Sequence, residues 1–418
     1  MEYGLIGEHL GHSFSAPIHE QLGGYPYALC PLRPDEVAKF FEEKAFRGIN
    51  VTIPYKETVM AYCDVIDQKA QDIGAVNTIV NRDGKLYGYN TDFDGVLYLL
   101  GRHNIDLAGK RVMVLGSGGT SKTVCAVARY QKAREVVVVS REEKAGLLSY
   151  TQAKSRKDIE VIINTSPVGM YPANDDMPID PAHYPKLSAV ADVIYNPLRT
   201  SFVLAAKARG LTAVGGLEML VSQAAFAVGH FLGREIEQGK VDDVYQGLLE
   251  QKANIVLIGM PSSGKTSVGK NLAKAFSRKF IDIDAEIKKE ANMPITEIFE
   301  KFGEEGFRHL EEKVAARFAK EGCLVISTGG GTIKREQSVL RLRQNGVVFY
   351  LDRRLNLLKV GGNRPLSTDF DRLAKLKSER APLYEKAADY IVKNNGQFKL
   401  AVKKIEESYH EIIRHQWA

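Results

Sequence analysis

Two glycine-rich turns, each placed between an apolar strand and a helix, restrict the fold of this chain more than any other feature. The strand predicted at Arg111–Leu115 leads into Gly116-Ser117-Gly118-Gly119-Thr120-Ser121. The strand predicted at Asn254–Ile258 leads into Gly259-Met260-Pro261-Ser262-Ser263-Gly264-Lys265-Thr266. Strand–turn–helix units of this kind bind phosphates at the edge of a parallel sheet. Each turn needs its own sheet, so the sequence predicts at least two nucleotide-binding units.

The rest of the pattern indicates the α/β class. Short β-branched runs alternate with helical periodicity along most of the 418 residues. Strands are predicted at Tyr3–Gly7, Tyr27–Leu32, Ile49–Ile53, Arg111–Leu115, Val136–Val139, Val161–Ile163, Val190–Val193, Thr212–Val214, Asn254–Ile258, Phe280–Ile283, Leu324–Ser327, Val347–Leu351 and Tyr390–Val392. Helices are predicted over Ile287–Phe302 and Phe307–Ala319, where apolar residues recur at i, i+3 and i+4, and over residues 239–253.

Charge and cysteine content narrow the class of protein. The chain carries 57 basic and 51 acidic side chains, a surplus of +6, which suits pockets for anionic small molecules. We expect no nucleic-acid partner, because aromatic and basic residues are not interleaved. We expect no membrane partner, because no apolar run is long enough to span a bilayer. The four cysteines lie far apart, which favours reduced thiols in a cytoplasmic protein. The oligomeric state stays open.

The second turn fits the P-loop pattern GxxxxGK[ST] at every fixed position. The backbone N–H groups of such a loop, here including Gly259, Ser262, Ser263 and Gly264, surround the phosphates of ATP. The ammonium group of Lys265 reaches the phosphate oxygens, and the hydroxyl group of Thr266 binds Mg²⁺. The sequence therefore predicts a site for ATP and Mg²⁺.

The first turn approximates a dinucleotide fingerprint, with Ser121 in place of the third glycine. Gly116, Ser117, Gly118, Gly119 and Thr120 are the candidate cofactor residues. In NAD-binding proteins an acidic residue after the next strand binds the ribose hydroxyl. Here Ser140-Arg141 occupies that place, and an arginine suits the 2′-phosphate of NADP(H). Glu142 or Glu143 offers the alternative of a ribose contact.

Further segments of the first half occur in a recognisable order: Gly11–Pro17, Asn50–Lys56, Gly74–Thr78, Asn90–Asp92, Asn164–Met170 and Gly216–Gln223. Together they resemble the shikimate dehydrogenase family, from residue 1 to about residue 250. The resemblance implies reduction of 3-dehydroshikimate by NADPH, with Lys56 and Asp92 as the catalytic pair. It places Ser13 and Ser15 at the substrate carboxylate, and Thr52, Asn77 and Gln223 at the ring hydroxyls. It places Thr165, Gly216 and Met219 at the cofactor.

The second half carries Asp282-Ile283-Asp284, Phe307-Arg308, Gly329-Gly330-Gly331, Arg364-Pro365-Leu366 and Arg380–Tyr384. These motifs, with the P-loop, resemble the shikimate kinase family from about residue 253 to the end. The resemblance implies that Asp282 helps to hold Mg²⁺ and that Asp284 contacts the shikimate hydroxyls, orients the attacking one and accepts its proton. It further implies that Arg308 and Arg380 clamp the shikimate carboxylate and that Gly330 and Gly331 allow the backbone to approach the ring closely. Arg364 would lie in the lid and reach the transferring phosphate.

The combined prediction is a fusion of two consecutive enzymes of the shikimate pathway. It has an α/β substrate domain (1–100), a Rossmann-like NADP-binding domain (101–235), a returning helix and linker (236–252), and a P-loop kinase domain with a parallel sheet (253–418). One alternative is an NAD-preferring dehydrogenase that also takes quinate, fused to a small-molecule kinase. The other is a regulator that binds shikimate and nucleotides without turnover. Taken singly, Ser13, Ser15 and Asp92 also fit helix caps, and Lys56 fits a solvated side chain.

Overall fold

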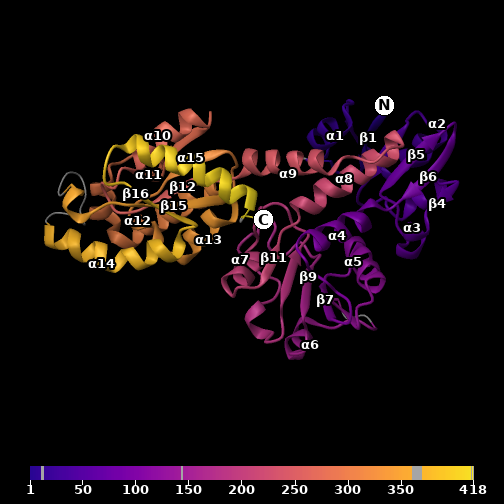
Figure 1. Cartoon of the computed structure of the whole chain (residues 1–418), viewed down its shortest axis with the longest axis horizontal. Helices are drawn as coiled ribbons and strands as arrows, with labels where there is room; N and C mark the ends of the chain where they lie inside the picture. Colours follow the sequence, from indigo (N-terminus) through magenta and orange to yellow (C-terminus); the bar gives the residue numbers. More distant parts are fainter. Residues whose placement is uncertain (11–13, 143–144, 360–369, 416, 418) are drawn as a thin grey trace. The chain divides into compact units, whose positions relative to one another are not determined.

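The computed structural model of this chain describes residues 1–10, 14–142, 145–359, 370–415 and 417. The chain divides into two compact units. The first unit is Met1–Gly169, Met177–Asn196 and Phe202–Tyr245, and the second is Gln246–Ala418 together with Met170–Asp176 and Pro197–Ser201. The described residues form three β-sheets (Figure 1), and the predicted α/β class is confirmed. Among the described residues, no helix has the length and apolar character that crossing a membrane requires.

The first sheet of unit 1 is mixed, with the strand order β2-β1-β3-β5-β6-β4. Its strands are β1 (Tyr3–Gly7), β2 (Ala28–Pro31), β3 (Gly48–Val51), β4 (Val65–Ile66), β5 (Thr78–Arg82) and β6 (Lys85–Tyr89). The helices beside it are α1 (Ser15–Gly23), α2 (Val37–Glu43), α3 (Gln68–Ile73) and α4 (Thr91–Arg102). Strands β1, β2 and β3 are parallel, which brings the segments after β1 and β3 to the same edge.

The antiparallel hairpin β5–β6 is absent from the predicted strands. Its two-residue turn is Asp83-Gly84, a dipeptide strongly favoured in tight hairpins, so the sequence does contain a signal for it. The predicted strands elsewhere are confirmed, with ends that shift by one or two residues.

The second sheet of unit 1 is parallel, with the order β11-β10-β9-β7-β8. Its strands are β7 (Arg111–Leu115), β8 (Glu135–Val139), β9 (Val161–Asn164), β10 (Ala189–Asp192) and β11 (Thr212–Val214). The helices are α5 (Gly119–Tyr130), α6 (Tyr150–Ser155), α7 (Ser201–Ala208), α8 (Leu217–Leu232) and α9 (Gln238–Lys252). The order of the strands reverses between β7 and β9, because β8 is added on one side of β7 and β9 on the other, and such sheets bind nucleotides at this place. Helix α8 packs against α4 and α1, so it borders both sheets of this unit.

The sheet of unit 2 is also parallel, with the order β13-β14-β12-β15-β16. Its strands are β12 (Asn254–Ile258), β13 (Lys279–Asp282), β14 (Leu324–Ser327), β15 (Gly346–Asp352) and β16 (Tyr390–Lys393). The helices are α10 (Lys265–Ala275), α11 (Ile283–Ala291), α12 (Ile295–Ala319), α13 (Glu336–Asn345), α14 (Phe370–Ala387) and α15 (Phe398–His415). Helices α10 and α15 cover one face of the sheet, and α12, α13 and α14 cover the other (Figure 1).

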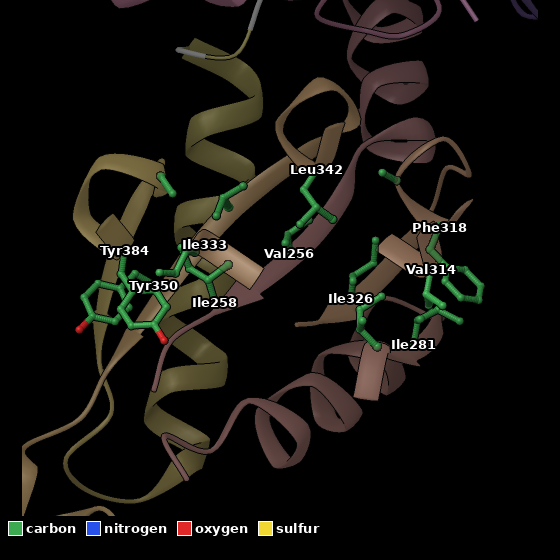
Figure 2. Close-up of a cluster of buried hydrophobic side chains, with 14 of the residues drawn as sticks. Val256, Ile258, Ile281, Val314, Phe318, Ile326, Ile333, Leu342, Tyr350 and Tyr384 are labelled. Atoms are coloured by element: carbon green, nitrogen blue, oxygen red, sulfur yellow. The ribbon is translucent and has the colours of Figure 1, made fainter. Parts of the chain in front are cut away.

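The core on the α12–α14 face supports the cavity that this sheet carries. Figure 2 shows apolar side chains of the strands meeting those of the helices, among them Val256, Ile258, Ile326, Tyr350, Val314, Phe318, Leu342 and Tyr384. The rings of Tyr350 and Tyr384 stack with centroids 4.9 Å apart. The Tyr384 hydroxyl group then donates a hydrogen bond to the Gly330 carbonyl oxygen, at 2.5 Å. The core thereby fixes part of the triple-glycine loop.

One helix prediction is wrong. The periodicity over Ile287–Phe302 predicts one helix, but the chain forms α11, a turn and then the start of α12. Asn292 adopts a left-handed backbone conformation with φ of 50°, and Pro294 is the N-cap of α12. Both residues end or begin helices for conformational reasons that apolar periodicity does not contain. Phe307–Ala319 and residues 239–253 are helical as predicted.

Candidate active sites

A cavity of about 400 Å³ in unit 1 gathers predicted residues from both of its sheets. It lies where β1 and β3 end and where β5, α4 and α8 begin. Its lining includes the predicted substrate and catalytic residues Ser15, Thr52, Lys56, Asn77, Asp92 and Gln223 and the predicted cofactor residues Thr120, Gly216 and Met219. The predicted residue Ser13 lies outside the described residues.

Lys56 and Asp92 form a direct ion pair inside this cavity. The Lys56 Nζ atom donates a hydrogen bond to Asp92 Oδ2 at 2.6 Å, and the two side chains are 24% and 14% exposed. Asn90, rather than Asp92, caps α4 by accepting a hydrogen bond from the Phe93 N–H group. The carboxylate of Asp92 is therefore free to hold the ammonium group. Phe14 occupies the N-cap position of α1, so Ser15 does not cap this helix.

The side-chain amide of Asn77 has a fixed orientation. Its Oδ1 atom accepts hydrogen bonds from the Thr91 N–H group at 2.8 Å and from the Thr78 hydroxyl group at 3.0 Å. A backbone N–H can only donate, so the oxygen of this amide faces Thr91 and the Nδ2 group is left for the cavity. Asn50 extends the network: its Nδ2 group donates to Thr78 Oγ1 at 3.0 Å, and its Oδ1 accepts from the Tyr27 hydroxyl group at 2.7 Å.

The turn after β7 is built to leave room for a ligand. Gly116 has φ of 108°, and a Cβ atom there would lie 3.0 Å from Thr165 Oγ1, which itself donates to the Leu115 carbonyl oxygen. A Cβ atom added to Gly118 or Gly119 would meet nothing within 4 Å. The protein's own packing does not require glycine at those two positions, whereas a pyrophosphate resting on the N-terminus of α5 would. The turn therefore fits a dinucleotide.

The two predicted cofactor segments lie side by side. Ser117 Oγ and Ser140 Oγ are 3.2 Å apart, which joins the turn after β7 to the end of β8. Arg141 follows Ser140 and is exposed, and the Ser140 hydroxyl oxygen accepts a hydrogen bond from the Glu142 N–H group. Glu143 lies outside the described residues.

A second cavity, of about 630 Å³, opens over the P-loop in unit 2. Lys265 Nζ donates to the carbonyl oxygens of Gly259 and Met260, at 2.8 and 3.0 Å. Thr266 Oγ1 donates to Asp282 Oδ2 at 2.9 Å, so the two predicted Mg²⁺ ligands are adjacent. Among the described residues, no cluster of three or more His, Cys, Asp or Glu side chains suits a metal ion. Thr266 and Asp282 fit a Mg²⁺ ion that takes its other oxygen ligands from phosphates and water.

The substrate side of this cavity is lined by the predicted residues Asp284, Arg308, Gly330, Gly331 and Arg380. Arg380 Nη1 donates to the Gly330 carbonyl oxygen at 2.8 Å. The Arg308 guanidinium group lies against Gly331, where a Cβ atom would be 2.1 to 2.4 Å from its Nη2, Cζ and Nη1 atoms. A side chain at position 331 would therefore displace the Arg308 guanidinium group from this place. The predicted lid residue Arg364 lies outside the described residues.

Asp284 has the character of a proton acceptor. Burial raises the pKa of its carboxyl group to about 6, and the negative charges of Glu311 and Asp282 act in the same direction. Lys265 and Arg308 oppose the change and only partly offset it. A carboxyl group with a pKa closer to neutrality is well matched to taking a proton from a hydroxyl group.

Several site residues were not predicted from the sequence. They are Tyr27, Asn50, Thr78 and Thr91 around Asn77, and Glu311, Thr332 and Tyr384 around the two arginines. Glu311 could have been predicted from the sequence, because it follows Arg308 by three residues on one helix. In the structure it accepts a hydrogen bond from Arg308 Nη1 at 2.5 Å. The others become neighbours only through contacts between segments that lie far apart in the sequence.

Comparisons with known proteins match both parts of the chain to protein families. The family described as shikimate dehydrogenase substrate binding domain matches residues 5–79, and the family described as shikimate kinase matches residues 261–415. The shikimate dehydrogenase (NADP(+)) of Clostridium perfringens is 36% identical over 265 residues, which are 59% of this chain and 97% of that protein. The enzyme of the same name from Caldanaerobacter subterraneus is 36% identical, over 57% of this chain and 95% of that protein.

Solved structures resemble the first part of the chain. A chorismate mutase/shikimate 5-dehydrogenase fusion protein from Clostridium acetobutylicum has a TM-score of 0.56 and 36% identity, covering 59% of this chain and 96% of that one. Shikimate 5-dehydrogenase from Thermus thermophilus, in complex with NADP(H) and shikimate, has a TM-score of 0.54 and 29% identity, covering 59% and 99%.

A dinucleotide-binding sheet beside a Lys–Asp pair, and a P-loop beside two buried arginines, define an oxidoreductase and a kinase in one chain. The chain belongs to the shikimate dehydrogenase family, and its second half is a shikimate kinase domain. Both kinds of enzyme are therefore present, with NADP, ATP and Mg²⁺ as their cofactors. The predicted fusion is confirmed, and the non-catalytic regulator is not supported.

Proposed function

We propose that this chain catalyses two consecutive reactions of the shikimate pathway. The first is reduction of 3-dehydroshikimate to shikimate by NADPH, and the second is phosphorylation of shikimate by ATP to 3-phosphoshikimate. One observation carries the proposal: each half has its own cavity, nucleotide turn and substrate groups, and the product of the first reaction is the substrate of the second. The described residues support this arrangement within each unit separately.

In the dehydrogenase, we assign proton donation to Lys56. When bound, NADPH supplies the hydride, and the carbonyl oxygen that becomes an alkoxide needs a proton and a nearby positive charge. The Lys56 ammonium group provides both, and Asp92 holds it at 2.6 Å. Ser13 and Ser15 would bind the substrate carboxylate. Thr52, Asn77 and Gln223 would bind the ring hydroxyls, with the Nδ2 group of Asn77 donating.

In the kinase, we assign Asp284 to orient the attacking hydroxyl group and to accept its proton. Lys265 and the Mg²⁺ ion held by Thr266 and Asp282 would offset the charge on the phosphate oxygens. Arg308 and Arg380 would bind the shikimate carboxylate, because guanidinium groups form paired hydrogen bonds with carboxylates. Arg364 is proposed to reach the transferring phosphate from the lid.

Separate assays test the two halves of the proposal. With 3-dehydroshikimate as the added substrate, the chain should consume NADPH without ATP. With shikimate as the added substrate, it should convert ATP to ADP without NADPH. A chain that lacks either activity while retaining the other would remove the corresponding half of the proposal.

We also propose the domain limits 1–100, 101–235, 236–252 and 253–418. The three sheets lie within residues 3–89, 111–214 and 254–393, which supports these limits. The four cysteines are unpaired, which supports the proposed cytoplasmic setting, where thiols stay reduced.

Arg141→Ala should weaken NADPH binding much more than NADH binding. The lost contact to the 2′-phosphate is charge-assisted, so we expect a loss of about 1.5–3 kcal/mol for NADPH. Michaelis constants for both cofactors measure the effect, and Glu142→Ala is the matched variant. If Arg141→Ala affects both cofactors equally, Arg141 does not bind the phosphate. If Glu142→Ala selectively weakens NADH, Glu142 binds the ribose.

Thr78→Val should raise the KM of the dehydrogenase for shikimate several-fold, with little change in the KM for NADP. The change removes the hydroxyl group that donates to Asn77 Oδ1 and accepts from Asn50, so Thr91 alone is left to hold the amide of Asn77 in its orientation. Leaving buried groups unpaired should also lower the free energy of unfolding by about 1–3 kcal/mol. Steady-state kinetics and urea denaturation measure the two effects. An unchanged KM at reduced stability would show that Asn77 does not depend on Thr78 for its orientation.

A further inference from the structure

Arg308, the proposed carboxylate-binding residue of the kinase, already contacts two carboxylates. Glu311 Oε2 accepts from its Nη1 atom at 2.5 Å, and Glu304 Oε1 accepts from its Nε and Nη2 atoms at 3.4 and 3.3 Å. The two partners differ in environment. The Glu311 side chain is 1% exposed and is also bound by Thr332, whereas the Glu304 side chain is 38% exposed. Glu304 is the partner that can leave.

The helical backbone of α12 is interrupted directly before Glu304. Gly303 has φ of 68° and ψ of −177° and interrupts the helical geometry of α12. This conformation is essentially restricted to glycine. Glu304 therefore begins the helical segment that carries Arg308, directly after the interruption at Gly303.

A second cation, Lys334, also contacts the Glu304 carboxylate. Lys334 Nζ donates to Glu304 Oε1 at 3.2 Å. Burial opposes ionisation of Glu304, but Lys334 and Arg308 outweigh it and hold the pKa of the carboxyl group below its ordinary value. Glu304 is thus an anion at neutral pH, and when it leaves Arg308 it keeps Lys334 as its partner.

The charges around Arg308 offer little attraction to a third carboxylate. Arg308, Glu304 and Glu311 together carry a net charge of −1, and Lys334 brings the cluster only to neutrality. An incoming carboxylate therefore gains little attraction from this cluster unless Glu304 withdraws from Arg308. Nε and Nη2 form an edge that can give a carboxylate two parallel hydrogen bonds, and Glu304 occupies both of these donors. An entering substrate carboxylate and Glu304 therefore compete for the same hydrogen-bond donors.

We propose that Glu304 is an internal substitute for the carboxylate of shikimate. While the site is empty, Glu304 accepts hydrogen bonds from Nε and Nη2 of Arg308. When the substrate carboxylate binds these donors, Glu304 stays bound to Lys334 alone. This inference rests on the proposed kinase function. It makes Glu304 a positioning residue that keeps Arg308 oriented and at the same time lowers the apparent affinity for substrate.

The test is Glu304→Gln in the full-length chain, assayed as shikimate-dependent ADP formation at saturating ATP and Mg²⁺ without NADP. Removing the competing charge should lower the KM for shikimate roughly 2–5-fold, the scale of a partly exposed ion pair. The KM for ATP should not change. Glu305→Gln is the matched control, because Glu305 is exposed and contacts Arg335 rather than Arg308. A KM for shikimate that rises or stays constant in Glu304→Gln overturns the exchange.

Lys334→Met provides an independent variant with the opposite expected sign. Without Lys334, Glu304 has no second partner, so the KM for shikimate should rise; an unchanged KM would contradict the exchange. A neutral methyl ester of shikimate, tested as an inhibitor, should bind Glu304→Gln and the wild type equally well. A gain for the ester would show that charge competition is not the cause. If the wild-type chain forms no ADP with shikimate, the proposed kinase function fails first, and that outcome is distinct from all of these.

Discussion

Replacement of Lys56 with methionine should lower dehydrogenase turnover by about 10²-fold or more, the usual scale for a lost general acid. Methionine retains much of the length of the side chain but cannot donate a proton or stabilise a developing alkoxide. The ammonium group lies 2.6 Å from Asp92 Oδ2 inside the cavity, while the cofactor turn begins at Gly116. The KM for NADPH should therefore change little. Initial rates of NADPH oxidation with 3-dehydroshikimate measure both parameters.

Lys122→Met is the matched control for this prediction. Lys122 is about half-exposed and forms a 2.6 Å ion pair with Glu57, outside the set of catalytic groups. Its loss should leave turnover within about twofold of the wild type, because exposed ion pairs contribute little. Both variants should retain full kinase activity. Equal turnover in Lys56→Met and the wild type would remove Lys56 from the catalytic role.

Asp284→Asn should lower kinase turnover by about 10²–10⁴-fold, the range expected for a lost general base. The amide has nearly the same shape but cannot take a proton from the attacking hydroxyl group. Initial rates of ADP formation with shikimate measure the loss, and dehydrogenase activity should be unchanged. A fall in ATP affinity at constant turnover would assign Asp284 to the nucleotide instead.

The stability of Asp284→Asn separates a catalytic role from a structural one. The pKa of this carboxyl group is raised to about 6, so at pH 7 it is ionised in the folded protein, and its ionisation lowers the stability relative to the unfolded chain. A neutral amide relieves this disfavoured charge and its repulsion from Glu311 and Asp282. The thermal unfolding midpoint at pH 7 should therefore not fall. A large decrease together with lost activity would indicate a structural role.

Much of the fold was predictable because its strongest signals are local. A strand, a glycine-rich turn and a helix follow one another in sequence at Gly116 and at Gly259, and both turns lie at the carboxyl edges of parallel sheets. The hairpin at Asp83-Gly84 was missed, although its turn is also local. The predicted helix over Ile287–Phe302 was wrong because Asn292 and Pro294 outweigh apolar periodicity.

The candidate sites likewise contain residues that the sequence predicts and residues that it does not. Lys56 and Asp92 could be predicted through a family resemblance, and the structure brings them together. The partners that orient such residues could not be predicted, because they come from distant segments. Thr78 meets Asn50 through pairing of β3 with β5, and Gly330 meets Tyr384 across the core of unit 2. The role of Gly331 as space for Arg308 likewise depends on tertiary contact.

The central claim is that one chain performs both reactions in order, and one incubation tests it directly. The purified full-length protein is given 3-dehydroshikimate, NADPH, ATP and Mg²⁺, and the products are quantified. We predict 3-phosphoshikimate, with one NADPH oxidised and one ADP formed for each molecule. Lys56→Met should block this product from 3-dehydroshikimate but not from added shikimate, and Asp284→Asn should stop at shikimate. Oxidation of NADPH without any 3-phosphoshikimate, in a wild-type chain supplied with ATP and Mg²⁺, would contradict the account.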